Sequence, residues 1–445
     1  MTTPSLVTSL PGPQAAAIVE RNRLSVTPSL PHAYPLAVKR AQGTMVEDLD
    51  GNRFLDCAAG IAVCSTGHCH PRVVQAIHDQ ATRLIHICGA DFYDPMYIAL
   101  AERLSNLAPG QSPKRTFLGN SGAEAVEAAF KLARYHTGRP GVVTFFGAFH
   151  GRTMGAVSLT ASKSLYHEGF GPMVPGVAHV PYAYCYRCHY NLTYPACNLA
   201  CVDAIEDTWF SRSLPPEQVA AIFVEPVQGE GGYIVPPDGW LKKLRALCDK
   251  YDILLVADEV QSGMGRTGKM FAVEHWGVEP DIICLAKALA SGMPISAMIA
   301  REGVMDWPPG AHGSTFGGNP VCCAAAQATL DVVVEENLLE KATRLGETLR
   351  ANLNDLAAES RLIGDVRGLG LMVGVELVKD KHTKARAKEE AEQVVQACFR
   401  RGLLLLTCGP NSVRFAPPLT ITAAEIDTAL SIFADALAEV ESMSL

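Results

Sequence analysis

The feature that most constrains the fold is an alternation of short apolar runs with longer stretches of helical periodicity. The helical stretches include Val73–Leu84 and Met96–Leu107. The apolar runs are Arg115–Leu118, Val142–Phe146, Ala220–Val224, Ile253–Ala257 and Ile282–Leu285. Strands that are apolar along their whole length are buried on both faces, and parallel strands need helical connections. The alternation therefore predicts an α/β fold with a mostly parallel sheet that helices cover.

The pattern changes near residue 325, which is the clearest boundary in the chain. We predict an N-terminal arm with part of a small domain over residues 1–72 and a large domain over 73–329. Residues 330–445 would complete a smaller α+β domain. Residues 1–35 are rich in Pro and Ser and are expected to be irregular. The last part should contain, in order, a long charged helix (Leu330–Ala358), strand-like segments (Gly370–Val378, Val413–Ala416) and a final helix from Ala423.

The composition excludes several classes of protein. The chain has 445 residues, of which 48% are hydrophobic and 19% charged, so it can bury a large core and is not disordered. Its net charge is −8, from 38 basic and 46 acidic residues, which disfavours binding to nucleic acids. No apolar run approaches the ~18 residues of a membrane helix. The first twenty residues lack the features of a signal peptide, so we expect a soluble cytoplasmic protein without a membrane partner.

Charged residues stand where three of the predicted strands end. Glu225 follows Ala220–Val224, Asp258 follows Ile253–Ala257, and Lys287 comes two residues after Leu285. Ligands of open α/β sheets bind beyond the carboxyl ends of the strands. A carboxylate there can pair with a cationic ring nitrogen. Burial would lower the pKa of a lysine amine and make it nucleophilic, although a lysine that extends its amine into solvent is the alternative.

Two glycine-containing segments are candidate anion sites. Ser121, Gly122 and Ala123 follow a predicted strand and open a predicted helix that ends at Gly138. Small residues at a helix N-terminus can bind a phosphate through backbone N–H groups, although Ser121 could be only an N-cap. Gly263–Gly268 matches GxGxxG, but it begins five residues after Asp258 and precedes a weak helix. We therefore interpret it as a glycine-rich surface loop rather than a nicotinamide site.

These residues belong to a series of motifs that resembles class III aminotransferases, which are pyridoxal-phosphate (PLP) enzymes of fold type I. The motifs run in order between about residues 36 and 420. They are Gly67-His68, His70-Pro71, Asn120–Ala125, Gly147–Thr153, Glu225–Gly232, Asp258–Gly268, Pro280-Asp281, Ala286-Lys287 and Ser314–Pro320. The chain is most similar to the 4-aminobutyrate and (acetyl)ornithine aminotransferases. The resemblance implies a large domain with a mostly parallel seven-stranded sheet and a smaller domain built from the terminal segments.

The resemblance also implies roles for individual residues in binding PLP. Lys287 would form the Schiff base with the cofactor, and its freed amine would then carry the proton of the reaction. Asp258 would keep the pyridine nitrogen protonated, which makes the ring an electron sink. Gln261 would bind the phenolic oxygen, and Phe149 would stack on the ring. His150 is expected among the cofactor-binding residues and Glu225 among the catalytic ones.

The phosphate site is expected to be shared between subunits. By resemblance, Ser121, Gly122 and Ala123 hold the phosphate of their own subunit. Thr315 would reach the phosphate of the neighbouring subunit. The resemblance therefore implies a homodimer or a dimer of dimers.

Four further residues resemble those that select the substrate. Arg152 would bind the carboxylate distal to the reacting amine, and Arg414 would bind the α-carboxylate of 2-oxoglutarate. Glu230 would pair with Arg414 when an ω-amino donor enters, and Ile61 would line the pocket. Arg152 could instead contact phosphate or protein. The expected reaction transfers an amino group from an ω-amino acid, with 4-aminobutyrate as the best candidate, to 2-oxoglutarate by a ping-pong route.

Other functions stay open. Ornithine, acetylornithine or a diamine could be the donor, and some proteins that resemble these aminotransferases are amino-acid racemases or epimerases. A nicotinamide-dependent oxidoreductase would depend on the GxGxxG segment. A binding protein without activity is disfavoured because Lys287, Asp258 and Gln261 are all present.

One segment has no counterpart in the family pattern. Tyr182–Val202 is an insertion that contains Cys185, Cys188, Cys197 and Cys201. Paired cysteines at this spacing suit zinc, while an iron–sulfur cluster, two disulfides or unlinked thiols are the alternatives. We assign no catalytic metal ion, and these four cysteines are a candidate structural site. The turn that contains Cys64, His68, Cys69 and His70 is expected to be structural.

Overall fold

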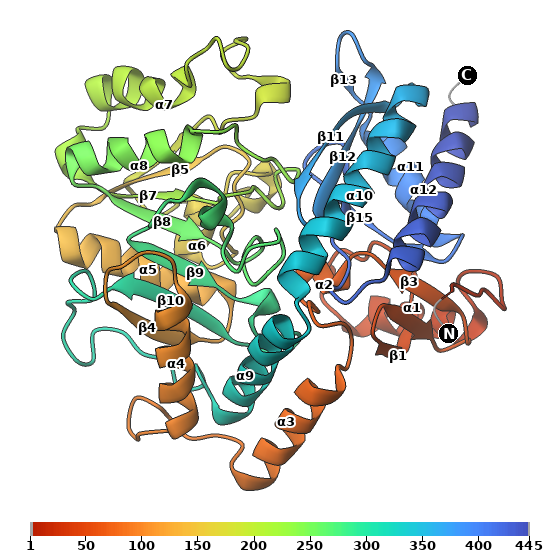
Figure 1. Ribbon diagram of the computed structural model, residues 1–445, viewed down its shortest axis with the longest axis horizontal. Helices are drawn as coiled ribbons and strands as arrows, with labels where there is room; N and C mark the ends of the chain where they lie inside the picture. The colour runs from red at the N-terminus through yellow and green to blue at the C-terminus, as the bar shows by residue number, and fades with distance from the viewer. Residues whose placement is uncertain (1–2, 444–445) are drawn as a thin grey trace. The chain divides into compact units, whose positions relative to one another are not determined.

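The structure is a computed structural model that describes residues 3–443. The chain forms two compact units (Figure 1). The central unit is Arg72–Leu339, and the terminal unit combines the described residues up to Pro71 with those from Glu340 onward. Each unit has its own sheets and helices.

The central unit is built on a seven-stranded sheet with the order β4-β10-β9-β8-β7-β5-β6. Strands β5 to β9 pair in parallel, and only β10 runs against its neighbours. The mostly parallel sheet is therefore confirmed. The strands are β4 (Lys114–Gly119), β5 (Gly141–Phe145), β6 (Val177–Val180), β7 (Val219–Val224), β8 (Leu254–Asp258), β9 (Ile282–Leu285) and β10 (Ser296–Arg301).

Helices enclose this sheet, as its buried central strands β5, β7, β8 and β9 require. The helix that packs most extensively on it is α5, whose Val126, Ala129 and Phe130 are buried in one core with Phe223 and Val256. The helices of this part of the chain are α3 (Pro71–Arg83), α4 (Pro95–Leu107), α5 (Gly122–Thr137), α6 (Met154–Leu159), α7 (Ala200–Ala204), α8 (Trp240–Tyr251) and α9 (Pro320–Glu335). Among the described residues, no helix is both long and apolar enough to cross a membrane.

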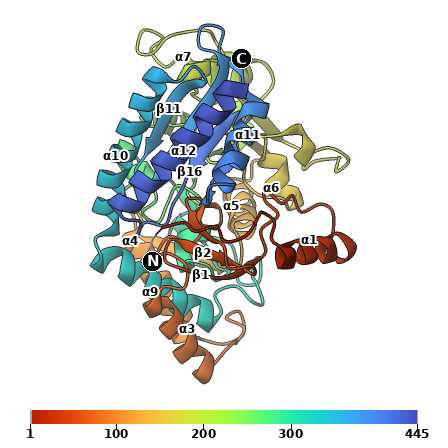
Figure 2. The same ribbon diagram turned by 90° about the vertical axis from the view of Figure 1, so that its right-hand side faces the viewer.

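The terminal unit contains two smaller sheets, with the orders β1-β2-β3-β14 and β11-β12-β16-β15. Helix α11 packs on the second sheet and α12 packs on α11 (Figure 2). The strands are β1 (Val38–Gln42), β2 (Met45–Asp48), β3 (Arg53–Asp56), β11 (Ile363–Leu369), β12 (Met372–Asp380), β13 (Ala385–Arg386), β14 (Leu403–Leu404), β15 (Leu406–Cys408) and β16 (Ser412–Phe415). The helices are α1 (Pro13–Ser25), α2 (Ala59–Ala62), α10 (Leu338–Glu359), α11 (Lys388–Phe399) and α12 (Ala423–Met443).

Two predictions about elements were wrong. Residues 1–35 are not wholly irregular, because they contain α1. The expected helix Leu330–Ala358 is two helices, since Asn337 takes a left-handed conformation (φ 51°) between α9 and α10. The strand expected near Gly370–Val378 is confirmed as β12, the second strand of a hairpin, and Gly370 (φ 51°) belongs to the turn between β11 and β12.

Candidate functional site

The predicted site residues of the central unit follow strands that end at one edge of its sheet. Strands β5, β7, β8 and β9 are parallel, and β4 shares their direction because β4 and β9 both run against β10. The carboxyl ends of all five strands therefore lie on one side, where ligands of such sheets bind. The residues there are Ser121 after β4, His150 after β5, Glu225 after β7, Asp258 at the end of β8 and Lys287 after β9.

Asp258 and His150 form a buried ion pair at this edge. The Oδ2 atom of Asp258 lies 2.7 Å from Nδ1 of His150, and its Oδ1 atom accepts a hydrogen bond from the N–H of Val260 at 3.0 Å. Burial lowers the pKa of His150, but the hydrogen bond and the charges of Asp258 and Glu225 outweigh this effect, so the pKa is raised. The imidazolium therefore orients the carboxylate. The sequence motif placed His150 at the cofactor but did not reveal this pairing.

Glu225 holds the loop that carries Phe149. Its Oε1 atom accepts the N–H of Phe149 and its Oε2 atom accepts the N–H of Gly229, both at 2.8 Å. Burial raises the pKa of Glu225 to about 7, although the positive charge of His150 opposes the shift. These bonds give Glu225 a positioning function for the aromatic ring, and its catalytic role stays a prediction.

Gln261 lies in the buried segment after β8 with its amide orientation fixed. Its Oε1 atom accepts a hydrogen bond from the hydroxyl of Tyr233 at 2.9 Å, which leaves Nε2 as the donor end. A Cβ atom on Gly229 would lie only 2.2 Å from Nε2. The position of the Gln261 amide therefore requires a glycine at Gly229. Its Nε2 group can donate a hydrogen bond to an anionic oxygen.

Lys287 is the first residue of a short 3-10 helix, Lys287–Ala290, that follows β9. Its backbone has a left-handed conformation (φ 42°), which is unfavourable for a residue with a side chain. The side chain is half-buried, whereas Ala286, Ala288 and Leu289 around it are buried. Strained backbone of this kind is concentrated at functional sites, where the surrounding structure enforces it.

The start of α5 has the form of an anion site. Ser121 caps the helix by accepting the N–H of Glu124 at 3.3 Å, so the N-cap interpretation holds as well. The N–H groups of Gly122 and Ala123 belong to the first turn and have no acceptor within the helix. A Cβ atom on Gly122 would lie 2.9 Å from Val260, so a glycine is needed for this close approach.

The residues at this edge fit PLP. A cationic ring nitrogen matches the buried carboxylate of Asp258, a phenolate oxygen matches the donor end of Gln261, and a phosphate matches the N-terminus of α5. An aldehyde needs an amine, which Lys287 supplies. All four groups belong to one unit and follow strands that end on one side of its sheet.

Two aromatic rings lie beside Arg152, and one of them, Tyr166, is hydrogen-bonded to Glu230. The guanidinium carbon lies 4.6 Å from the centre of the Tyr166 ring and 5.9 Å from that of Phe149. Glu230 accepts hydrogen bonds from Lys163 at 2.7 Å and from Tyr166 at 3.4 Å. Sequence reasoning missed Lys163 and Tyr166, because neither belongs to the quoted motifs. Arg152 itself is exposed, so its charge is accessible to a ligand.

The other predicted substrate and phosphate residues lie elsewhere. Arg414 is buried on β16 and Ile61 is 43% exposed on α2, so both belong to the terminal unit. Thr315 is exposed in the loop before α9. Their predicted roles stay predictions.

The GxGxxG segment is not a surface loop, and that expectation was wrong. Every residue from Gly263 to Gly268 is buried, and the side chain of Arg266 is fully enclosed. Gly265 and Gly268 have positive φ angles of 89° and 88°, which explains the glycines as turn residues. The next helical element is a five-residue 3-10 helix, Ala272–Trp276, which is not the α-helix that a dinucleotide site requires.

The two cysteine-containing segments have different surroundings. Nε2 of His68 lies 2.7 Å from Oδ2 of Asp56, whose Oδ1 atom accepts the N–H groups of Ala58 and Ala59, so this turn is structural as expected. The four cysteines of the insertion are unlinked and line one pocket. Burial, together with the charges of the other three thiols, raises the pKa of Cys201 to about 11.

Comparisons with known proteins agree with this geometry. A model of the family described as Aminotransferase class-III matches residues 28–437. The 4-aminobutyrate aminotransferase of Mycobacterium tuberculosis is 42% identical over 98% of both chains. The 5-aminovalerate aminotransferase DavT of Pseudomonas aeruginosa is 41% identical over 95% of this chain and 98% of that protein. The isoleucine 2-epimerase of Lentilactobacillus buchneri is 39% identical over 96% and 95%.

Solved structures agree as well. The (S)-enantioselective omega-transaminase of Thermomicrobium roseum has a TM-score of 0.88 and 36% identity, with 96% of this chain and 99% of that chain covered. A PLP-bound amine transaminase from an uncultivated Pseudomonas species has a TM-score of 0.86 and 32% identity, with 93% and 97% covered.

Proposed function

The chain belongs to the class-III aminotransferases, which depend on PLP, and from this premise we propose that it transfers an amino group from an ω-amino acid to 2-oxoglutarate. The best candidate for the donor is 4-aminobutyrate. The proposed route is ping-pong, in which the donor leaves as an aldehyde before the keto acid enters.

Each residue at the carboxyl edge of the sheet would have a separate role in the reaction. Bound PLP supplies an electron sink for the negative charge that develops when the substrate carbon loses its proton. Asp258, held by His150, stabilises a proton on the ring nitrogen. The amine of Lys287 removes the proton from the substrate carbon and returns it. The start of α5 binds the phosphate, and Glu225 holds Phe149 in place to stack on the ring.

The observation that carries the choice of donor is the setting of Arg152. Its guanidinium is exposed and lies beside the rings of Tyr166 and Phe149. It is therefore a planar cation next to Phe149, the ring that would stack on the cofactor. A guanidinium binds a carboxylate in a bidentate manner. An ω-amino acid has a carboxylate several bonds away from its amine, which suits a cation beside the reacting centre. Arg414 would bind the α-carboxylate of 2-oxoglutarate, with Glu230 as its alternative partner and Ile61 lining the pocket.

A half-reaction screen tests this proposal. The holoenzyme is mixed with 4-aminobutyrate, 5-aminovalerate, β-alanine, ornithine, acetylornithine or putrescine without any keto acid, and the cofactor absorbance is followed. We expect 4-aminobutyrate to convert the cofactor to its aminated form, and Arg152→Lys to raise the half-saturating concentration of this donor. Conversion by putrescine but by no amino acid would exclude the proposed donor class.

An amino-acid epimerase is the second candidate, and the similarity to isoleucine 2-epimerase favours it. Both reactions begin with loss of a proton from the carbon that bears the amino group, and they differ in where a proton returns. Incubation of the holoenzyme with single L-amino acids, without a keto acid, separates them. Loss of optical rotation with no aminated cofactor would establish epimerisation instead.

We also propose that the enzyme assembles as a homodimer or a dimer of dimers with shared sites. Thr315 is exposed in its own subunit. Its hydroxyl is therefore accessible to the phosphate site of a second copy.

A further inference from the structure

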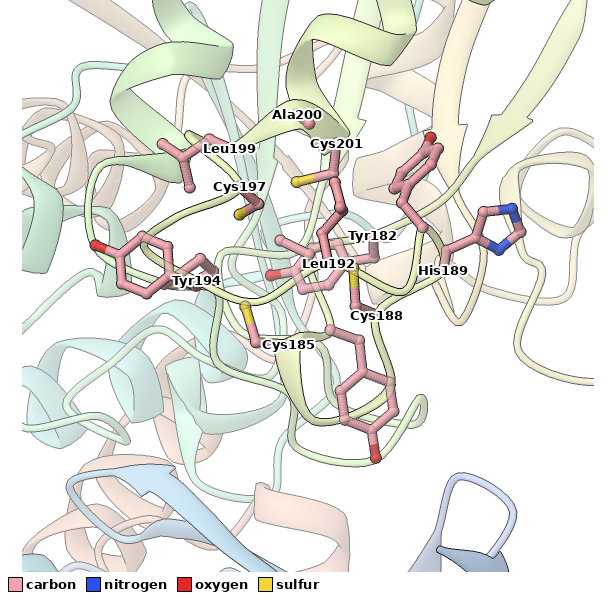
Figure 3. A pocket seen from close by; sticks show the side chains of 14 residues that line it. Tyr182, Cys185, Cys188, His189, Leu192, Tyr194, Cys197, Leu199, Ala200 and Cys201 are labelled. Carbon is pink, nitrogen blue, oxygen red and sulfur yellow. The ribbon is translucent and has the colours of Figure 1, made fainter. Parts of the chain in front are cut away.

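The four cysteines of the insertion Tyr182–Val202 take no part in the reaction described above. Cys185 and Cys188 flank one 3-10 turn, Cys185–Arg187, and Cys197 and Cys201 flank the start of α7. Their sulfur atoms gather around one space, while the ring of His189 points away from it (Figure 3). Two separate stretches of chain therefore present four soft donor atoms to the same place.

The insertion cannot be ordered by a hydrophobic core of its own. No residue from Tyr184 to Cys201, all of which the structure describes, is buried. Its backbone hydrogen bonds are local, such as Asn191 N–H to Cys188 and Cys197 N–H to Thr193. Lys243 of α8 holds the carbonyl of Asn198 at 2.9 Å, which fixes one end. Segments with so little apolar burial are usually ordered by a cross-link, either a metal ion or disulfides.

The space between the sulfur atoms has the size of a single ion. The cavity has a volume of about 20 Å³, and all four cysteines line it. A cavity of roughly this volume holds one water-sized particle. Leu192, Leu199 and Pro237 also line it. Four thiolates in an apolar surround are the typical ligand set of structural zinc.

We propose that Cys185, Cys188, Cys197 and Cys201 bind one Zn²⁺ ion. No set of three or more His, Cys, Asp or Glu side chains within residues 3–443 already has the arrangement of a metal site, so binding requires the cysteines to change rotamer. A cysteine side chain has one rotatable bond, about Cα–Cβ, through which its sulfur atom can be redirected. Four thiols release four protons as four Zn–S bonds form, and no electron is transferred.

The zinc site would stabilise the active-site edge through Tyr182. This residue lines the cysteine cavity, and its hydroxyl donates to the carbonyl oxygens of Glu225 at 3.0 Å and Pro226 at 3.2 Å. Its ring packs against Trp240 and Phe145. The insertion is thus connected to the residue that positions Phe149, although the zinc ion would take no part in the chemistry.

Metal and thiol analysis of the purified full-length holoenzyme tests the proposal without any variant. We expect one zinc ion per chain by elemental mass spectrometry. When the protein is produced in zinc-depleted medium supplemented with Co²⁺, we expect the intense near-ultraviolet absorption of thiolate-bound cobalt. Four free thiols at these positions with no metal, two disulfides, or bound iron would each overturn the proposal.

Variants then assign the ligands. Cys197→Ser/Cys201→Ser should reduce the bound zinc from one ion per chain to less than a tenth. Cys69→Ser, which removes an exposed cysteine outside the cluster, should leave the zinc content unchanged. Full zinc content in the double variant would overturn the assignment. If the double variant does not fold, the metal and thiol counts of the unmodified holoenzyme still decide.

Discussion

Asp258 shows how a single residue is prepared for its chemistry. Its carboxylate is buried, which would normally favour the neutral acid. His150 supplies a positive charge at 2.7 Å and Val260 supplies an N–H group, so both oxygens have donors before any ligand arrives. The carboxylate is thus preorganised to stabilise a proton on the ring nitrogen.

Asp258→Asn should lower kcat of the half-reaction by about 100-fold or more, because an amide cannot stabilise the protonated ring. Stopped-flow absorbance of the holoenzyme measures this rate. Asp281→Asn is the matched control. Asp281 is also buried, but it precedes β9 and pairs with Arg245 and Arg301 at the opposite edge of the sheet. It should cost stability and leave kcat within about threefold. Equal loss of kcat in both variants would contradict the role of Asp258.

His68 should make the stability of the protein depend on pH. Burial lowers its pKa, but the hydrogen bonds to Asp56 and Cys64 outweigh this effect and raise the pKa to about 10 from 6.5. Its contribution is therefore complete below pH 6.5 and is lost as the pH rises through about 10. His68→Gln should cost about 1–3 kcal/mol at pH 6.5 and much less at pH 10. Denaturant unfolding at several pH values measures the difference. A difference that stays constant with pH would exclude the ion pair.

Among the elements, α5 combines a ligand site and an ordinary helix end. Its N-terminus needs a glycine because Val260 lies close to it, and its C-terminus needs one because Gly138 has a φ angle of 66°. The two glycines therefore serve different purposes on the same helix. One is required by a close approach at the site and the other by backbone conformation alone.

Gly122→Ala should raise the dissociation constant of PLP about tenfold, which corresponds to about 1.4 kcal/mol, because the new methyl group displaces Val260 and the helix start. Gly138→Ala meets open space and should cost about 1 kcal/mol of stability through strain, with no change in PLP affinity. Spectral titration of the apoenzyme with PLP compares them. The same loss of affinity in both variants would mean that the helix start is not the phosphate site.

The success of sequence reasoning also differed between elements. The five short runs were identified as strands because they are mostly apolar and alternate with stretches of helical periodicity. Helix α1 was missed because its first N–H groups are capped by Asp50, some 35 residues away, with bonds of 2.9 and 2.8 Å. The break at Asn337 was missed because the charged helical pattern continues through it. Long-range caps and single left-handed residues leave no periodic signal.

The same limit applies within the site. Strand-end position and motif spacing predicted roles for Asp258, Lys287 and the start of α5, and the structure brings these residues to one edge of the sheet. They could not reveal that His150 orients Asp258 or that Lys163 holds Glu230, because these partners are 108 and 67 residues apart in sequence.

At the scale of the whole molecule, the proposed sharing of sites between subunits predicts complementation between damaged subunits. Thr315→Ala should weaken PLP binding, and Lys287→Ala should abolish the reaction. In a hybrid dimer of the two variants, one site would combine an intact Lys287 with an intact Thr315 from the other subunit. The isolated hybrid should therefore show about half the activity of the unmodified dimer at limiting PLP.

Differently tagged subunits allow the hybrid to be purified. Dimers of the unmodified protein, produced with the same two tags and purified in the same way, serve as the control. If Thr315 acts within its own subunit, the hybrid would instead show the weak PLP binding of the Thr315→Ala protein.

The most direct measurement of the central assignment is to locate the lysine that bonds to the cofactor. The holoenzyme is reduced with sodium borohydride, digested and analysed by mass spectrometry. We predict that the pyridoxyl group is found on the peptide that contains Lys287, and that Lys287→Ala carries none. A pyridoxyl group on Lys163 or any other lysine would contradict the assignment.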